Sequence, residues 1–247
     1  MNTKKKFDVI VFGATGFTGR LVAQYLLKRY GVGGDVAWAI AGRSAAKLAE
    51  VRQALGAPET LPILTADATD QRALMQLVEQ TKVMLTTVGP YQRYGEPLAR
   101  ACATAGTDYV DLCGEPLWMA QMIPALEPLA QASGARIVFS CGFDSIPFDL
   151  GVVFVQDEAQ RRFGQPLRHV HGRVKRMKGG ASGGTIASML ATLEAIRATP
   201  ALARTLRDPF ALTPGFKGPR QPPGSNAAYD ELAHSWTGPS VMAQINT

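Results

Sequence analysis

The sequence predicts an α/β protein with a doubly wound parallel sheet, followed by an incomplete α+β domain. Across residues 1–150, six short segments rich in strand-forming residues alternate with helical patterns. The first of these segments, residues 8–12, runs directly into a loop with glycines at every third position and then into a helix. Strands joined by crossover helices form parallel sheets, and ligands gather beyond the carboxyl ends of such strands.

The glycine loop has the spacing G-x-x-G-x-x-G, a close relative of the dinucleotide fingerprint. The first glycine permits a tight turn, the second lets backbone approach a pyrophosphate, and the third lets the helix pack on the sheet. The N-terminus of that helix offers N–H groups and a partial positive charge. A Walker loop is excluded because Arg20, not lysine, follows the last glycine. The expected contacts are Gly13, Thr15, Gly16, Phe17, Thr18 and Gly19.

The remaining elements follow in chain order. Further strands are expected over residues 36–41, 61–66, 83–87, 109–112 and 136–140, and helices over residues 45–55, 117–132 and 151–162. Asp70 is expected to cap a helix that carries Leu74, Leu77 and Val78 on one face. Pro97 is expected to begin the next helix, because its missing N–H costs nothing in a first turn.

The end of the second predicted strand selects the cofactor. Enzymes that use NAD usually place Asp or Glu there, where it binds the ribose 2′-hydroxyl. This chain instead has Arg43 and Ser44, with Lys47 one helical turn later. A guanidinium can clamp a 2′-phosphate and a hydroxyl can donate to it, whereas the alternative is an ordinary surface arginine. The pattern therefore predicts NADP(H).

Two further strand ends offer cofactor contacts. Asp67 follows the third strand, where it can accept a hydrogen bond from the adenine amino group or cap the next helix. The fourth strand is followed by residues expected to pass the pyrophosphate and the nicotinamide ribose, namely Val88, Gly89, Pro90 and Tyr91. Tyr91 either flanks the nicotinamide or packs in the interior.

No catalytic residue can be assigned from a motif. The short-chain dehydrogenase mechanism needs a lysine four residues after a tyrosine, and none of the six tyrosines has one. Tyr91, Asp144 and Ser145 are candidates by location alone. Cys113 and Cys141 also end strands, but small buried cysteines are common and no histidine lies near them in sequence.

Charge is distributed unevenly along the chain. Residues 1–150 hold 14 basic and 14 acidic residues, whereas residues 151–247 hold 12 and 6, so the whole net charge of +6 lies in the second part. This shift predicts a boundary near residue 150, between an NADP-binding domain (1–150) and a partial substrate or dimerisation domain (151–247). Three cysteines without metal-ligand spacing favour a reduced, cytoplasmic compartment and no metal site. We expect no nucleic-acid partner and no membrane span.

The second part is less regular. Residues 167–177 alternate, with His169, His171, Arg173 and Lys175 on one face, which is either a receptor for an anionic group or the solvated side of a sheet. A second glycine loop, with Ser182, Gly183, Gly184 and Thr185, opens a helix and is either a substrate contact or a tight connection. Residues 209–224 are rich in proline and glycine and predict an irregular loop.

Several of these segments together resemble the saccharopine dehydrogenase-like oxidoreductases, in the branch that includes trans-acting enoyl reductases. The segments are residues 13–19, 41–43, 88–91, 109–111, 114–115, 142–147 and 182–185. The resemblance implies an NADP-dependent reductase with a Rossmann domain and an α/β substrate domain, and it assigns residues 182–185 to the substrate side. Saccharopine-forming members carry D-P-G where this chain has residues 144–146, which argues against an amino-acid substrate.

Members of that family extend beyond the end of this chain, so the substrate domain is expected to be incomplete. Residues 236–247 are then expected to be weakly anchored or to pack against another copy, as in a homodimer. The functional prediction is an NADPH-dependent oxidoreductase that reduces an activated double bond or carbonyl of a lipid-like, small organic or carrier-bound acyl substrate. The alternative is an NADP(H)-binding sensor or scaffold without turnover.

Overall fold

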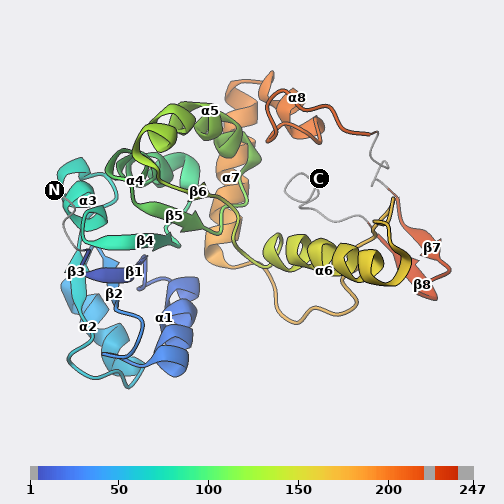
Figure 1. The fold of residues 1–247 in the computed structure, drawn as a ribbon. Helices are drawn as coiled ribbons and strands as arrows, with labels where there is room; N and C mark the ends of the chain where they lie inside the picture. The colour runs from blue at the N-terminus through green and yellow to red at the C-terminus, as the bar shows by residue number, and fades with distance from the viewer. Residues whose placement is uncertain (1–4, 220–225, 239–247) are drawn as a thin grey trace.

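The computed structural model describes residues 5–219 and 226–238, and its centre is a six-stranded parallel sheet (Figure 1). The strand order is β3-β2-β1-β4-β5-β6, so the direction of winding reverses between β1 and β4. The strands are β1 Phe7–Phe12, β2 Trp38–Gly42, β3 Ile63–Thr65, β4 Thr81–Thr86, β5 Asp108–Asp111 and β6 Ile137–Val138. All six predicted strands are present, with ends shifted by no more than two residues.

Helices cover both faces of the sheet because successive strand residues point to opposite sides. Val11 and Ile40 face α1 (Phe17–Tyr30) and α2 (Ala45–Ala54), where Leu48 packs in the same core cluster. On the other face, Ile10 and Met84 belong to the larger cluster under α3 (Gln71–Val78), α4 (Tyr91–Ala105) and α5 (Pro116–Ser133). Burial on both faces explains the nearly continuous apolar character of the central strands.

The rest of the chain extends from one end of this sheet. It contains α6 Ile146–Phe163, α7 Gly183–Ala198, α8 Leu202–Arg207 and an antiparallel hairpin of β7 Ala228–Asp230 and β8 Ser235–Thr237. Figure 1 shows α7 beside α4 and α5, whereas α6 runs away from the sheet towards the hairpin. The expected boundary at residue 150 falls inside α6, and the division into two domains stays a prediction.

Asp70 caps α3 as predicted, because its side chain accepts from the Ala73 N–H at 3.0 Å. The prediction for Pro97 is wrong. Pro97 lies inside α4, which begins six residues earlier at Tyr91. The carboxyl group of Glu115 accepts from the first two N–H groups of α4, so the start of this helix does not depend on a proline at its first position.

Of the two alternatives for the alternating residues 167–177, the solvated side of a sheet is wrong, because no strand is present there. His169, His171, Arg173 and Lys175 are exposed, as are most of their neighbours on either side. In the described part of the chain no other strand lies alongside this segment, and a strand forms only where a neighbour completes its hydrogen-bond ladder. Arg173 instead forms an ion pair with Asp230 at 2.5 Å.

Residues 209–219 contain turns but neither helix nor strand, which agrees with the predicted irregular loop, and residues 220–224 lie outside the described residues. Trp236 is part of β8. The prediction for the C-terminal end falls mostly on residues 239–247, which also lie outside the described range. None of the described helices combines the length and the apolar character needed to cross a bilayer.

Candidate functional site

The turn after β1 places backbone where side chains would not fit. Gly13 has φ +93°, a region that favours glycine, and a Cβ there would lie 2.7 Å from the side chain of Val88. A Cβ at Gly19 would lie 2.2 Å from the Gly13 carbonyl oxygen, so this glycine lets α1 pack directly against the turn. Gly16 is the N-cap residue of α1 and carries no side chain that could cover the first N–H groups. This arrangement fits a bound pyrophosphate.

A cleft of about 260 Å³ opens beside this turn, at the carboxyl ends of β1, β2, β3 and β4. Its lining consists of Phe12, Gly13, Thr15, Gly16, Gly42, Arg43, Asp67, Ala68, Thr87, Val88, Gly89 and Tyr94. The structure thus brings together residues from four separate strand ends that the sequence analysis had selected. The remaining predicted cofactor residues do not line this cleft, namely Phe17, Thr18, Gly19, Ser44, Lys47, Pro90 and Tyr91.

The residues around the end of β2 divide into two roles. Arg43 is exposed and lines the cleft, where an anion can reach it. Ser44 is the N-cap residue of α2, and its hydroxyl accepts from the Lys47 N–H at 3.3 Å. The Ser44 side chain therefore holds the start of the helix next to Arg43. Lys47 is exposed one turn into α2.

Asp67 lies in the cleft and forms a local turn. Its carboxyl group accepts from the Thr69 hydroxyl at 2.6 Å and from the Thr69 N–H at 2.9 Å, and these bonds lower the pKa of Asp67 below its usual value. Asp70 is the residue that caps the following helix, so the helix-capping alternative for Asp67 does not apply. The adenine contact stays a prediction.

The structure corrects the assignment of Tyr91. Its ring is only 4% exposed, its hydroxyl donates to the Thr86 carbonyl at 3.3 Å, and the ring packs against Trp118. Burial raises the pKa of Tyr91 well above its usual value. Of the two alternatives, the structure therefore shows the packed one. The tyrosine that lines the cleft is Tyr94, one helical turn later, which the sequence analysis did not select.

The ends of β5 and β6 surround a second cavity of about 310 Å³, on the α1 side of the sheet. It is lined by Thr18, Val22, Leu85, Val110, Asp111, Leu112, Cys141, Gly142, Phe143 and Asp144. Asp144 and Ser145 lie directly before α6, with Ser145 at its N-cap position. Asp144 is thus the one candidate catalytic residue that lines either cavity, and its catalytic role stays a prediction.

Glu115 is a buried residue that the sequence analysis did not select for the site. It is 1% exposed, and its two carboxyl oxygens accept from the N–H groups of Tyr91 at 2.8 Å and Gln92 at 2.9 Å. Pro90, the N-cap residue of α4, has no side chain that can do this. Glu115 therefore fixes the start of α4, directly after the cleft residues Val88 and Gly89.

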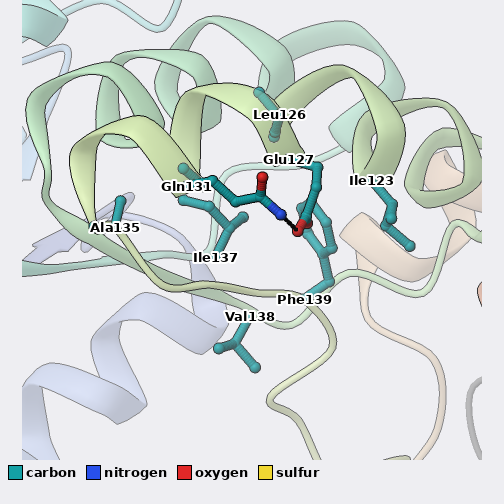
Figure 2. A pocket seen from close by; sticks show the side chains of 10 residues that line it. Ile123, Leu126, Glu127, Gln131, Ala135, Ile137, Val138 and Phe139 are labelled. Carbon is teal, nitrogen blue, oxygen red and sulfur yellow. Dashed lines mark hydrogen bonds between the residues drawn. The ribbon is translucent and has the colours of Figure 1, made fainter.

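A further groove, of about 420 Å³, lies between α5 and the edge strand β6 (Figure 2). Ile123, Leu126 and Phe139 form part of its apolar lining, and Gln131 donates to Glu127 at 2.7 Å above it. None of the predicted site residues lines this groove. Among the described residues no group of three or more His, Cys, Asp and Glu side chains could hold a metal ion.

The cleft geometry agrees with a comparison with protein families. Residues 9–138 match the saccharopine dehydrogenase NADP binding domain. The chain belongs to this family. The family match covers the parallel sheet except for the first two residues of β1, and it includes the glycine turn and Arg43, so NADP(H) is the cofactor of the domain.

Longer relatives of this family match nearly the whole chain. A Mycobacterium tuberculosis protein provisionally named a trans-acting enoyl reductase is 44% identical over 254 residues, which cover 99% of this chain and 60% of that protein. Trans-acting enoyl reductases of Mycobacterium leprae and Mycobacterium ulcerans are 38% and 36% identical, and again 60% of each is covered. The chain therefore spans 60% of the length of these curated relatives.

Among solved structures, the chain is similar to apo saccharopine dehydrogenase (L-Glu forming) from Saccharomyces cerevisiae. The TM-score is 0.49 at 20% identity, over 63% of this chain and 32% of that one. The segment of Ser182, Gly183, Gly184 and Thr185 lies outside the matched family domain. Ser182 is the N-cap residue of α7, and its hydroxyl accepts from the Thr185 N–H at 3.2 Å. A role of these residues in substrate binding stays a prediction.

Proposed function

We propose that the protein is an NADPH-dependent reductase that transfers hydride to an activated double bond of a lipid-like acyl substrate, with an activated carbonyl as the other acceptor class. The observation that carries the cofactor part is the position of Arg43 in the cleft beside the glycine turn. β2 ends at Gly42 and is followed by Arg43 and Ser44, without the carboxylate that would repel a 2′-phosphate.

In this proposal, the chain's residues bind and orient the cofactor. The backbone of Gly13 to Gly16 and the N-terminus of α1 hold the pyrophosphate, Arg43 holds the 2′-phosphate, and Asp67 accepts from the adenine amino group. Val88 and Gly89 direct the nicotinamide half towards the ends of β4 and β5. Bound NADPH supplies the hydride, and the protein contributes position and electrostatics.

The acceptor is inferred from two features. Relatives that share 36–44% identity with the chain are named trans-acting enoyl reductases, which supports an enoyl thioester on a carrier as the substrate. The cavity at the ends of β5 and β6 is lined mainly by apolar groups, together with the carboxyl groups of Asp111 and Asp144, and this suits an acyl group more than a charged amino acid. Asp144 is the candidate proton source in this arrangement.

The test is a screen for substrate-dependent loss of NADPH fluorescence. Enoyl thioesters and semialdehydes are added to the protein with NADPH or NADH, and cofactor affinity is measured separately by calorimetry. We expect NADPH oxidation with an enoyl thioester at a higher rate than with a semialdehyde. NADPH binding without oxidation by any acceptor would contradict the reductase and support the alternative, an NADP(H)-binding sensor or scaffold.

A further inference from the structure

Glu115 lies between the N-termini of two helices. It is the N-cap residue of α5, and its carboxyl oxygens cap α4 through Tyr91 and Gln92. Helix N-termini carry a partial positive charge, so two of them favour an acidic group at this point. The contact joins residues that are 24 apart in sequence and places a buried carboxyl group under the loop that follows β4.

The same carboxyl group reaches a third element. The hydroxyl of Ser188, in α7, donates to Glu115 Oε1 at 2.6 Å. Two more polar contacts join α7 to the first turn of α4: Gln92 Nε2 donates to Thr192 Oγ1 at 3.0 Å, and Arg93 pairs with Glu194 at 2.8 Å. Figure 1 shows α7 beside α4 and α5. Glu115 is therefore shared between the NADP-binding sheet and a helix of the following part.

The loop that Glu115 holds is part of the cofactor cleft. Val88 and Gly89 line the cleft and lie directly before Pro90 and the capped residues Tyr91 and Gln92. A displacement of the first turn of α4 moves these two residues, because only Pro90 separates them from the helix.

We propose that Glu115 is a positioning residue that transmits the docking of α7 to the Val88–Gly89 segment of the cofactor cleft. When Ser188 donates to Glu115, the carboxyl group is oriented so that both oxygens face the N–H groups of Tyr91 and Gln92. When α7 is displaced, this restraint is lost and the segment is no longer fixed against the nicotinamide half of the cofactor. Only the NADPH readout of this inference rests on the proposed function.

The competing explanation is a purely structural cap, and the choice of variants separates the two. Glu115→Gln keeps the size of the side chain but replaces one acceptor by a donor, so one of the two N–H groups loses its partner. Ser188→Ala leaves the cap intact and removes only the hydrogen bond from α7 to Glu115, while the contacts of Thr192 and Glu194 with α4 remain. Thr107→Val is the matched control, because Thr107 is fully buried directly before the amino end of β5, away from the cleft, where its hydroxyl donates to the Val78 carbonyl at 2.8 Å and accepts from Lys5 at 2.6 Å.

The first measurement is hydrogen exchange of the amides of residues 88–94 without cofactor. We expect faster exchange in both Glu115→Gln and Ser188→Ala, by about threefold or more in the latter, and no change in this segment in Thr107→Val. Unchanged exchange in Ser188→Ala would overturn the coupling, whether or not the protein binds NADPH.

The second measurement is NADPH affinity by calorimetry, together with thermal stability. We expect binding about tenfold weaker in Glu115→Gln, a smaller loss in Ser188→Ala, and wild-type affinity in Thr107→Val despite its lower stability. If Glu115→Gln loses stability but keeps NADPH affinity, the residue is a structural cap and the proposal is wrong. If wild-type protein binds no NADPH, the proposed function fails, while the exchange comparison still decides the coupling.

Discussion

The hydroxyl of Tyr109 donates to Asp111 Oδ2 at 2.8 Å, and both side chains are buried at the end of β5. The other oxygen of Asp111 accepts from the N–H groups of Cys113 at 2.9 Å and Ser140 at 2.8 Å. Asp111 thus ties the end of β5 to the segment after β6, where the second cavity lies. Burial raises the pKa of Asp111 to about 6, although these hydrogen bonds oppose the shift.

This raised pKa predicts a loss of stability with rising pH. Between the ordinary value of 3.8 and about 6, the folded protein keeps the Asp111 proton while the unfolded chain has released it. The free energy of unfolding therefore falls as pH rises through this window, and the shift corresponds to about 3 kcal/mol. Below pH 3.8 both states hold the proton and this contribution is fully present.

The measurement is urea unfolding of the wild type and Asp111→Asn at pH 4 and pH 7. The amide keeps an acceptor for Cys113 and Ser140 and a donor for Tyr109, but it does not titrate. We expect the wild type to lose about 2–3 kcal/mol more than the variant between these pH values. Other acidic groups, such as Asp8 and Asp108, have lowered pKa values and change stability with pH in the opposite direction. Their contributions are the same in both proteins and cancel when the wild type is compared with the variant. Parallel pH profiles would contradict the prediction.

Replacement of Arg43 tests the cofactor preference. Arg43→Ala removes the guanidinium from the cleft, and a lost hydrogen-bonded charge contact corresponds to about tenfold to hundredfold weaker NADPH binding. NADH affinity should not change, because NADH has no 2′-phosphate. Calorimetry with both cofactors measures the difference. Arg29→Ala, in the last turn of α1, serves as the control for lost charge, and equal effects of the two substitutions would refute the assignment.

Replacement of Gly19 tests the contact between α1 and the glycine turn. A methyl group at this position meets the Gly13 carbonyl oxygen at 2.2 Å, so the backbone must shift, and we expect Gly19→Ala to destabilise the protein by about 1–3 kcal/mol. It should also abolish measurable NADPH binding. Gly151→Ala is the matched control in α6, where a Cβ meets nothing within 4 Å, and it should stabilise the fold by about 0.5–1 kcal/mol. Equal melting temperatures of the two variants would show that the close approach is absent.

The three cysteines should differ in their reactivity. Cys102 and Cys113 are buried and burial raises the pKa of each well above its usual value, whereas Cys141 is partly exposed beside the second cavity. Thiol labelling followed by mass spectrometry should modify Cys141 at least about tenfold faster than the other two, which must wait for local opening. Equal labelling in native buffer would contradict the described burial.

The sequence alone was sufficient to predict the strands of the sheet. It was also sufficient to predict the part of the cleft formed by residues that directly follow those strands. Strand periodicity and the torsional freedom of Gly13 are local properties, so they can be read without a structure. The position of Arg43 beside the glycine turn could also be predicted, because the carboxyl ends of parallel strands meet at one edge of a sheet. Asp70 could be assigned as a cap since its partner is only three residues away.

Only the tertiary structure decided the contacts between distant segments. The burial of Tyr91 and the exposure of Tyr94 to the cleft depend on the rotation of α4, which is set by its packing against α5 and by Glu115. The alternating segment at residues 167–177 does not become a strand without a neighbour. Residues 114–115 belong to the family resemblance, but the contacts of Glu115 could not be read from the sequence, because Tyr91 and Ser188 lie 24 and 73 residues away from it. Such contacts arise from folding as a whole, and local propensity contains no information about them.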